Sequence, residues 1–278
     1  MSKLFAVLGS PISHSKSPAI HTAAYRVLGE DWQYRSFEVA KGALKRFIES
    51  EATEYSGFSL TMPLKENAFD FADETDELSR LTKASNTLIK RDGKWFGYNT
   101  DIFGLTQAIS LKISATPQHS LILGSGATAT SAMVAIASIA PGSSVSVFAR
   151  NKTARQALVE FGTSLGLSVK HSKFLGIAIS KADLTISTLP GGALDEIFDK
   201  LSKRKALVPG GLLLDVAYSP WPSKLADFWF SRNQPVVSGL EMLIWQAIAQ
   251  IRIFRNGSTE NHLPNEIAVV EAMRNAVS

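Results

Sequence analysis

The stretch His119-Ser120-Leu121-Ile122-Leu123-Gly124-Ser125-Gly126-Ala127-Thr128-Ala129 decides the fold of this chain. Its first five residues form a short apolar run typical of a buried strand, and the small residues from Ser131 to Ile139 predict a helix. Glycines between such a strand and helix let the backbone approach a pyrophosphate, which the N–H groups at the helix N-terminus attract. The same glycine spacing occurs in ordinary loops, so the strand and helix around it are what favour a dinucleotide-binding unit.

The alternation of strand and helix continues on both sides of this stretch. Further strands are predicted at 144–149, 182–188 and 212–216, with helical stretches between them. This order is typical of an open, mostly parallel sheet of the Rossmann type. The polar segment 111–118 precedes the stretch and contains a proline, so it predicts a link to another domain.

The first half of the chain predicts a second sheet. The apolar run Leu4–Gly9 reads as a buried strand, and Ser17 and Pro18 then predict an N-cap and the first position of a helix that ends at Gly29. There follow a predicted strand at 34–39, a helix at 43–50 and a strand at 57–61 that breaks at Met62-Pro63. The predicted fold class is therefore α/β, with two open, mostly parallel sheet domains.

Two helices are predicted at the C-terminal end. Residues 241–254 are apolar nearly all round, and a helix opening at Pro264 would place four apolar residues on one face, namely Ile267, Val270, Met273 and Val277. At roughly 150 residues per domain, a length of 278 residues agrees with two domains.

Composition excludes several classes of function. The 29 Lys and Arg against 25 Asp and Glu give a net charge of only +4, and the longest basic run is Lys203–Lys205, so nucleic acid is not the expected partner. The absence of cysteine excludes disulfides and thiolate sites, and the five histidines lack metal-ligand spacing, so no metal is expected. No apolar run reaches the roughly 18 residues of a membrane span. We therefore expect a cytoplasmic protein with a small-molecule partner and no membrane.

The residues after the strand 145–149 bear on cofactor choice. At this point an acidic residue would bind the ribose 2′-hydroxyl of NAD, whereas an arginine would accept the 2′-phosphate of NADP. The chain has Arg150, Asn151 and Lys152 there and no carboxylate. The missing carboxylate and the two basic residues together favour NADP(H). Taken alone, Arg150 and Lys152 could be solvated charges of a loop.

Polar groups gather in four short segments of the first half. They are Ser13–Pro18, Ser59–Lys65, Ser85–Thr87 and Gly97–Asp101. The serines at the predicted strand-to-helix junction could bind a carboxylate or phosphate together with the helix N-terminus, or could be an ordinary cap. The other segments, taken singly, could be turn residues or a surface lysine.

Taken together, these segments carry a resemblance. Gly9-Ser-Pro-Ile-Ser-His-Ser-Lys-Ser-Pro18, Thr61-Met-Pro-Leu-Lys65, Ser85-Asn-Thr87, Asn99-Thr-Asp101 and Ser238-Gly-Leu-Glu-Met-Leu243 with Gln246 occur in this order. The set resembles the shikimate dehydrogenase family over almost the whole chain. The resemblance implies a substrate-binding and catalytic domain over 1–103, a Rossmann NADP-binding domain over 104–238, and C-terminal helices over 239–278 that pack back on the first domain. It also implies reversible, NADP-dependent reduction of 3-dehydroshikimate to shikimate, in aromatic amino-acid biosynthesis.

The family's site residues match this sequence position by position. Lys65 and Asp101 match the catalytic pair. Ser15 and Ser17 match the serines that hold the substrate carboxylate, while the remaining substrate-binding matches are Thr61, Asn86, Tyr218 and Gln246. The cofactor-binding matches are Gly124, Gly126, Ala127, Arg150, Asn151, Gly239 and Met242. In such a site Lys65 would exchange a proton with the reacting oxygen while hydride moves to or from the nicotinamide, and Asp101 would position it.

Three positions depart from the family's pattern. The family commonly has asparagine at Ser59, a second adjacent glycine at Ala127, and Asn-Arg-Thr at Ala149-Arg150-Asn151. The alternatives to this function are a quinate/shikimate dehydrogenase that prefers NAD, a non-catalytic NADP(H) sensor and, by analogy of fold alone, another two-domain dehydrogenase such as a folate enzyme. A sensor has no need of a proton-transfer pair, and the serine pair for a carboxylate disfavours the folate enzyme.

Overall fold

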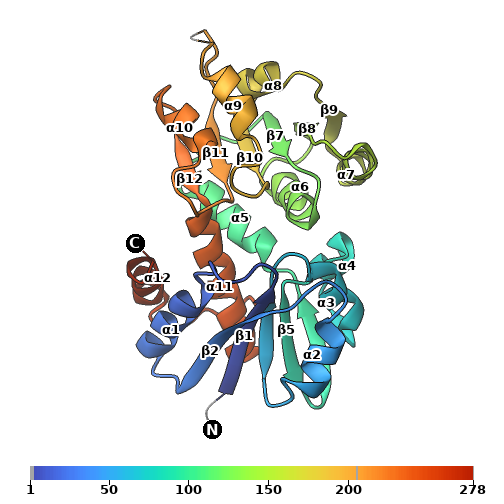
Figure 1. Cartoon of the computed structure of the whole chain (residues 1–278), viewed down its shortest axis with the longest axis vertical. Coiled ribbons are helices and arrows are strands. Elements are labelled where there is room, and N and C mark those ends of the chain that lie inside the picture. The colour runs from blue at the N-terminus through green and yellow to red at the C-terminus, as the bar shows by residue number, and fades with distance from the viewer. Residues whose placement is uncertain (1–2, 205, 278) are drawn as a thin grey trace. The chain divides into compact units, whose positions relative to one another are not determined.

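The computed structural model describes residues 3–204 and 206–277, and the chain forms two compact units (Figure 1). The first unit comprises the residues up to Gly104 together with those from Leu243 onward, and the second unit comprises Leu105–Met242. Each unit contains one six-stranded sheet. The predicted α/β class is confirmed.

The sheet of the first unit mixes parallel and antiparallel strands. Its order is β2-β1-β3-β5-β6-β4, with β1 (Lys3–Gly9), β2 (Trp32–Glu38), β3 (Gly57–Leu60), β4 (Glu74–Thr75), β5 (Thr87–Arg91) and β6 (Lys94–Tyr98). β1 runs parallel to β2 and β3, and β4 runs parallel to β6, whereas β5 is antiparallel to both of its neighbours. The sequence analysis missed the β5–β6 hairpin, although its turn is Asp92-Gly93, both in the left-handed region that such turns require.

Helices cover both faces of this sheet (Figure 1). α1 (Ser17–Leu28), α11 (Gly239–Asn256) and α12 (Glu266–Asn275) lie on one face, and α2 (Leu44–Ser50) and α3 (Lys65–Phe71) on the other. Because side chains alternate along a strand, Phe5 of β1 stacks on Phe254 of α11 at 4.3 Å between ring centroids, while Leu8 joins the core with Leu44 and Leu64. α12 packs against α1, so the C-terminal helices complete the first unit as expected.

Two local predictions about these helices are wrong. Lys16, not Ser17, occupies the N-cap position of α1, without a side-chain cap, and Ser17 is the first helical residue. Ile267 is 78% exposed, because α12 begins at Glu266 and turns Val270 and Met273, but not Ile267, toward the core.

The second unit has an all-parallel sheet in the Rossmann strand order. The order is β12-β11-β10-β7-β8-β9, with β7 (His119–Leu123), β8 (Ser144–Phe148), β9 (Ser168–His171), β10 (Leu184–Ser187), β11 (Leu212–Asp215) and β12 (Val236–Ser238). The strands predicted around the glycine stretch are present in this sheet, and the Rossmann-type assignment is confirmed.

The helices of the second unit follow the strands in alternation. α6 (Ala127–Ile139) and α7 (Lys152–Ser164) pack on one face, while α8 (Leu175–Lys181), α9 (Asp195–Leu201) and α10 (Lys224–Phe230) form the core of the other face with β7 and β11. α6 begins at Ala127 rather than Ser131, so the glycine turn leads directly into its first turn. The helix therefore presents its N-terminus beside the two glycines.

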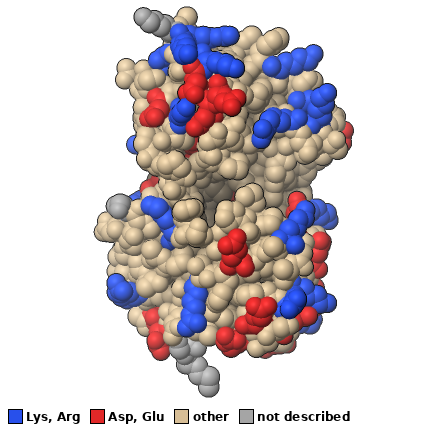
Figure 2. All heavy atoms as spheres, viewed as in Figure 1, with Lys and Arg blue, Asp and Glu red and all other residues tan. Residues whose placement is uncertain are grey.

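Neither a metal cluster nor a membrane-spanning helix occurs in the described residues. Within 3–204 and 206–277, no group of three or more His, Asp or Glu side chains could hold a metal ion. In the same part of the chain, the length and apolar content of every helix fall short of what a membrane crossing needs. On the face seen in Figure 2, Lys and Arg side chains are interspersed with Asp and Glu, and no broad basic field is visible.

Candidate active site

One edge of the first unit's sheet collects most of the predicted polar residues. β1, β3 and β6 end at this edge and the antiparallel β5 begins there, as the pairings Leu8–Leu60, Ser59–Thr87 and Thr87–Tyr98 show. The chain segments that follow β1, β3 and β6, and the one that precedes β5, are the four segments singled out in the sequence. The topology thus explains why residues far apart in the chain meet.

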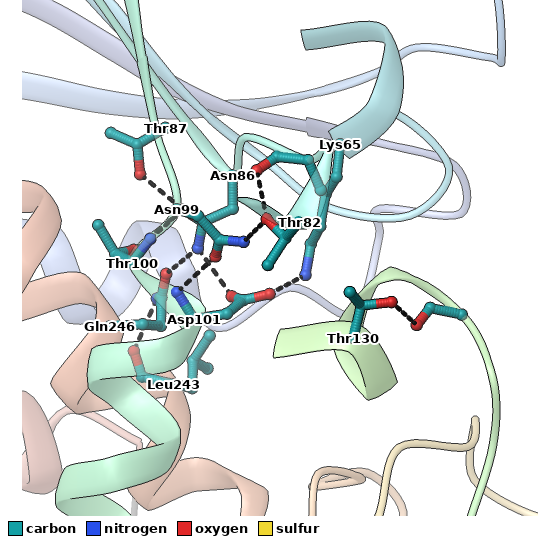
Figure 3. A network of polar contacts seen from close by, with 12 residues as sticks. Lys65, Thr82, Asn86, Thr87, Asn99, Thr100, Asp101, Thr130, Leu243 and Gln246 are labelled. Atoms are coloured by element: carbon teal, nitrogen blue, oxygen red, sulfur yellow. Dashed lines mark hydrogen bonds and ion pairs between the residues drawn. The ribbon is translucent and has the colours of Figure 1, made fainter. Parts of the chain in front are cut away.

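Lys65 and Asp101 form an ion pair at this edge (Figure 3). Lys65 is the first residue of α3, which follows β3, and Asp101 is the first residue of α5 (Asp101–Ser110), which follows β6. Their side chains are only 14% and 5% exposed, so the attraction between the charges is less screened than at the surface. An amine held in this way can exchange a proton with a bound molecule while the carboxylate balances its charge.

Asn86 orients Asp101 (Figure 3). The backbone N–H of Thr100 donates to Asn86 Oδ1 at 2.8 Å, and since a backbone N–H can only donate, this contact fixes which way the amide faces. Asn86 Nδ2 consequently donates to Asp101 Oδ1 at 2.7 Å. Each carboxylate oxygen of Asp101 thus has its own donor, one from Asn86 and one from Lys65.

Gln246 reaches the same cluster from α11 (Figure 3). Its Nε2 donates to the carbonyl of Leu243 at 2.8 Å, which leaves Oε1 3.4 Å from Asn86 Nδ2. The structure therefore brings together four of the predicted site residues, Lys65, Asn86, Asp101 and Gln246.

Asn99 fixes the start of α5, a role that the sequence analysis did not assign. Its Oδ1 accepts from the Asp101 N–H at 3.1 Å, and its Nδ2 donates to Thr82 Oγ1 at 2.8 Å, at the C-terminal end of α4 (Glu77–Thr82). Asparagine two residues before a helical acidic residue is a turn-forming signal that could have indicated this.

Ser15, Ser17 and Thr61 lie at the neighbouring strand ends. The Ser17 N–H donates to Ser15 Oγ at 3.3 Å, at the start of α1. Thr61 follows β3, and its N–H donates to the carbonyl of Leu8 at 2.9 Å. The segment after Thr61 returns against β1, where a β-carbon at Gly9 would overlap Thr61 Cγ2 and lie 3.0 Å from the carbonyl oxygen of Met62, so a larger residue there would displace Thr61.

Ser59 points into the sheet core rather than standing among the proposed substrate ligands. Its hydroxyl accepts from Tyr34 at 2.6 Å and donates to Gln250 Oε1 at 2.8 Å. Ser59 is buried, and these two partners account for its one donor and one of its acceptor positions.

In the second unit, the glycine turn leaves the N-terminus of α6 open. Gly124 has a φ of +116°, which side-chain-bearing residues rarely adopt, and a β-carbon at Gly126 would meet no atom within 4 Å. Gly126 is the N-cap and offers no side chain to the backbone N–H groups of the first turn, where Ala127 lies. Backbone N–H groups at a helix N-terminus that no side chain caps suit a phosphate.

Arg150 and Asn151 follow β8 at the same edge of the second sheet. Arg150 is exposed, and Asn151 Oδ1 accepts from the Ala154 N–H at 3.0 Å as the N-cap of α7. Asn151 therefore has a structural role that the sequence analysis did not foresee, because a cap residue was not considered at this position. No Asp or Glu occurs between Ala149 and Ala154.

Tyr218, Gly239 and Met242 also belong to the second unit. Tyr218 follows β11 and is half-buried, and Met242 is buried in the first turn of α11. Gly239 begins that helix against the backbone of Val216, where a β-carbon would overlap. Nearby, burial raises the pKa of Asp215, against the hydrogen bond that Ser223 donates at 2.5 Å.

Comparison with known proteins covers nearly the whole chain. Residues 7–88 match the model of the shikimate dehydrogenase substrate binding domain. The chain is 28% identical over 258 residues to the shikimate dehydrogenase (NADP(+)) of Staphylococcus aureus (strain MRSA252), covering 91% of this chain and 92% of that protein.

Solved structures give the same assignment. The crystal structure of Mycobacterium tuberculosis shikimate dehydrogenase is 36% identical, with a TM-score of 0.85, over 98% of this chain and 99% of that chain. The enzyme from Thermus thermophilus in complex with NADP(H) and shikimate is 26% identical, with a TM-score of 0.81, over 99% and 100% of the two chains. The chain therefore belongs to the shikimate dehydrogenase family of oxidoreductases.

Proposed function

We propose that this protein is an NADP-dependent shikimate dehydrogenase that reversibly reduces 3-dehydroshikimate to shikimate. The observation that carries the proposal is the shielded Lys65–Asp101 pair, with Asn86 fixed on the second carboxylate oxygen. A protein that only senses nucleotides has no use for such a pair. The named activities of the relatives in Staphylococcus and Mycobacterium agree with this function.

The chemistry assigns different tasks to Lys65 and Asp101. A bound nicotinamide supplies or accepts the hydride. Lys65 donates a proton to the substrate oxygen when the ketone is reduced, and takes the hydroxyl proton in the reverse direction. Asp101 holds the amine in place and compensates its charge, and Asn86 keeps the carboxylate from rotating away.

The remaining polar residues would hold the substrate. Ser15 and Ser17 would bind its carboxylate beside the N-terminus of α1, where the helix dipole favours an anion. The ring hydroxyls would be bound by Thr61, Asn86 and Gln246, and Tyr218 of the second unit would line the substrate pocket. All of these substrate residues except Tyr218 belong to the first unit, whereas the proposed nucleotide residues belong to the second unit.

The second unit suits NADP(H). The open N-terminus of α6 with Gly124, Gly126 and Ala127 would hold the pyrophosphate, and Gly239 and Met242 would lie toward the nicotinamide. Arg150 would bind the 2′-phosphate, with part of the charge supplied by Lys152. The complex of the Thermus enzyme with NADP(H) and shikimate is consistent with this choice.

The test is nucleotide reduction by the purified protein with four combinations of substrates: shikimate or quinate, each with NADP or NAD. We expect kcat/KM to be highest for shikimate with NADP. A higher value for quinate, or equal use of the two nucleotides, would favour the quinate/shikimate dehydrogenase instead. Tight NADP binding without turnover of either acid would identify a sensor.

A further inference from the structure

Gln250 is a buried amide that the mechanism above does not use. It lies on α11 one turn beyond Gln246 and is 1% exposed, among apolar residues such as Ile248 and Ile251. Burying an amide costs free energy unless both ends find hydrogen-bond partners. Gln250 has three hydrogen bonds, to Asn86, Thr87 and Ser59, and the first two connect it to the site.

The orientation of the Gln250 amide is fixed by a backbone carbonyl. Nε2 donates to the carbonyl oxygen of Asn86 at 3.2 Å and to Thr87 Oγ1 at 3.1 Å. Because a carbonyl oxygen can only accept, the nitrogen must face it, and Oε1 must face Ser59. The Ser59 hydroxyl therefore donates to Gln250, and Tyr34 donates to Ser59.

Hydrogen bonds of fixed direction also connect Gln250 to Asp101. Thr87 Oγ1 accepts from Gln250, so its own proton is free to go to Asn86 Oδ1 at 2.9 Å. Asn86 Nδ2 then donates to Asp101, which holds Lys65. Figure 3 shows the inner part of this series, from Thr87 through Asn86 to Asp101 and Lys65. Every proton in the series from Tyr34 to Asp101 has one possible direction.

The outer end of the series carries no charge at neutral pH. Tyr34 stacks on His21 of α1 with ring centroids 3.9 Å apart. Burial lowers the pKa of His21 to about 3 and raises the pKa of Tyr34. The charged groups of the series are therefore Asp101 and Lys65.

We propose that Gln250 is a positioning residue for the Lys65–Asp101 pair, acting through Thr87 and Asn86. Its amide ties β3, β5 and α11 together where the Thr87 hydroxyl adds a donor to Asn86 Oδ1 beside those from Thr100. The expected effect of Gln250 on kcat rests on the proposed function. The expected effect of Gln250 on the position of the Lys65 side chain does not.

The first test compares Gln250→Met with Gln250→Glu. Methionine keeps the volume and removes both hydrogen-bonding ends, so kcat with shikimate and NADP should fall about ten- to a hundredfold, with the KM for NADP unchanged. A protonated glutamic acid can still donate to the Asn86 carbonyl and accept from Ser59. Gln250→Glu should therefore approach wild-type kcat at acidic pH and lose it as pH rises and the new carboxylate ionises. Wild-type kcat in folded Gln250→Met would overturn the proposal.

Ile251→Val is the matched control for packing, because Ile251 is a buried neighbour on α11 with an apolar side chain. It should keep wild-type kcat, and a loss as large as that of Gln250→Met would reduce Gln250 to a packing role. Thermal melting of each variant identifies any that fails to fold. If Gln250→Met does not fold, Ser59→Ala takes its place, because it removes the donor to Gln250 Oε1. The expected loss of kcat in Ser59→Ala is several-fold.

A second readout does not depend on turnover. With lysines dimethylated using ¹³C formaldehyde and the Lys65 signal identified by Lys65→Arg, the Lys65 resonance should move in Gln250→Met and stay in place in Ile251→Val. An inactive wild type whose Lys65 signal responds in this way would contradict the proposed function alone. An active wild type whose Lys65 signal is unmoved in Gln250→Met would contradict the positioning role alone.

Discussion

Single backbone groups determine the chemistry of the site at the scale of residues. The Thr100 N–H sets the direction of the Asn86 amide, the Leu243 carbonyl sets that of Gln246, and the Asn86 carbonyl sets that of Gln250. Because backbone groups cannot exchange donor for acceptor, these contacts fix the orientation of each side-chain amide. Such preorganisation is what proton transfer requires.

Ser15 and Ser17 give the first prediction at this scale. Replacing both with alanine should weaken shikimate binding strongly, since hydrogen bonds to a charged group contribute about 1.5–3 kcal/mol each. NADP(H) binding should be unchanged, because both serines belong to the first unit. Calorimetric titration of each ligand separates the two effects, and the exposed neighbour Ser13→Ala is the control. Unaltered shikimate affinity in a folded double variant would remove these serines from the carboxylate site.

His21 gives a prediction about stability and pH. Burial lowers its pKa from 6.5 to about 3, so the unfolded chain binds a proton that the folded chain does not. The contribution to stability is full above the unfolded pKa and is lost as pH falls toward the folded pKa. The slope is about 1.4 kcal/mol per pH unit within that window.

Urea unfolding at several pH values between 6.5 and about 5 measures this slope for wild type, His21→Gln and the exposed His14→Gln. His21→Gln should flatten the dependence of the free energy of unfolding on pH, and His14→Gln should not. A wild-type slope retained by His21→Gln would mean that another group is responsible.

The residues of the pair were predicted, and with them Asn86 and Gln246, but not the buried amide behind them. All four followed from the resemblance to the shikimate dehydrogenase family, whose motifs occur here in order. Gln250 did not, because a buried amide on an apolar helix has no local pattern that names its partners on β3 and β5. Its spacing of four residues from Gln246 was the available signal.

At the scale of elements, the proposed choice of NADP rests on the end of β8 and the start of α7. Arg150 is exposed at this point and no carboxylate is near it in the sequence. Arg150→Ala should raise the KM for NADP sharply and leave the low activity with NAD almost unchanged, because a guanidinium forms paired charge-assisted bonds with a phosphate.

Initial rates with each nucleotide test this, with Lys200→Ala on α9 as an exposed control of the same charge change. A residual preference for NADP is expected from Lys152. An equal loss of kcat/KM with both nucleotides would show that Arg150 does not bind the 2′-phosphate.

Elements built from periodic apolar residues were predictable, and those defined by pairing were not. The strands and helices around the glycine stretch have strong local patterns and were predicted, although α6 begins at Ala127, before the predicted start at Ser131. The hairpin of β5 and β6 was missed because its residues were interpreted only as turn and site chemistry. The start of α1 was misplaced by one residue because Ser17 and Pro18 fit an N-cap pattern that the structure does not adopt.

At the scale of the whole molecule, the chain forms two sheets, and the proposed function assigns the substrate mainly to one and the nucleotide to the other. The second unit is continuous in sequence, whereas the first is completed by the C-terminal part of α11 and by α12. α11 therefore begins beside the proposed nicotinamide residues Gly239 and Met242 and continues to Gln246 and Gln250 in the site. This continuity, which follows from the chain path alone, lets one helix contribute to both units.

The Lys65–Asp101 pair is the central claim, and turnover by variants tests it most directly. Shikimate-dependent reduction of NADP should be followed for wild type, Lys65→Ala, Asp101→Asn and the exposed control Lys45→Ala, together with calorimetric shikimate affinity. Because proton transfer contributes roughly 10²–10⁴ in rate, Lys65→Ala and Asp101→Asn should each lower kcat at least about a hundredfold and change affinity far less. Lys45→Ala should match the wild type. Near wild-type kcat in either of the first two variants would contradict the assignment of that residue to the chemical step.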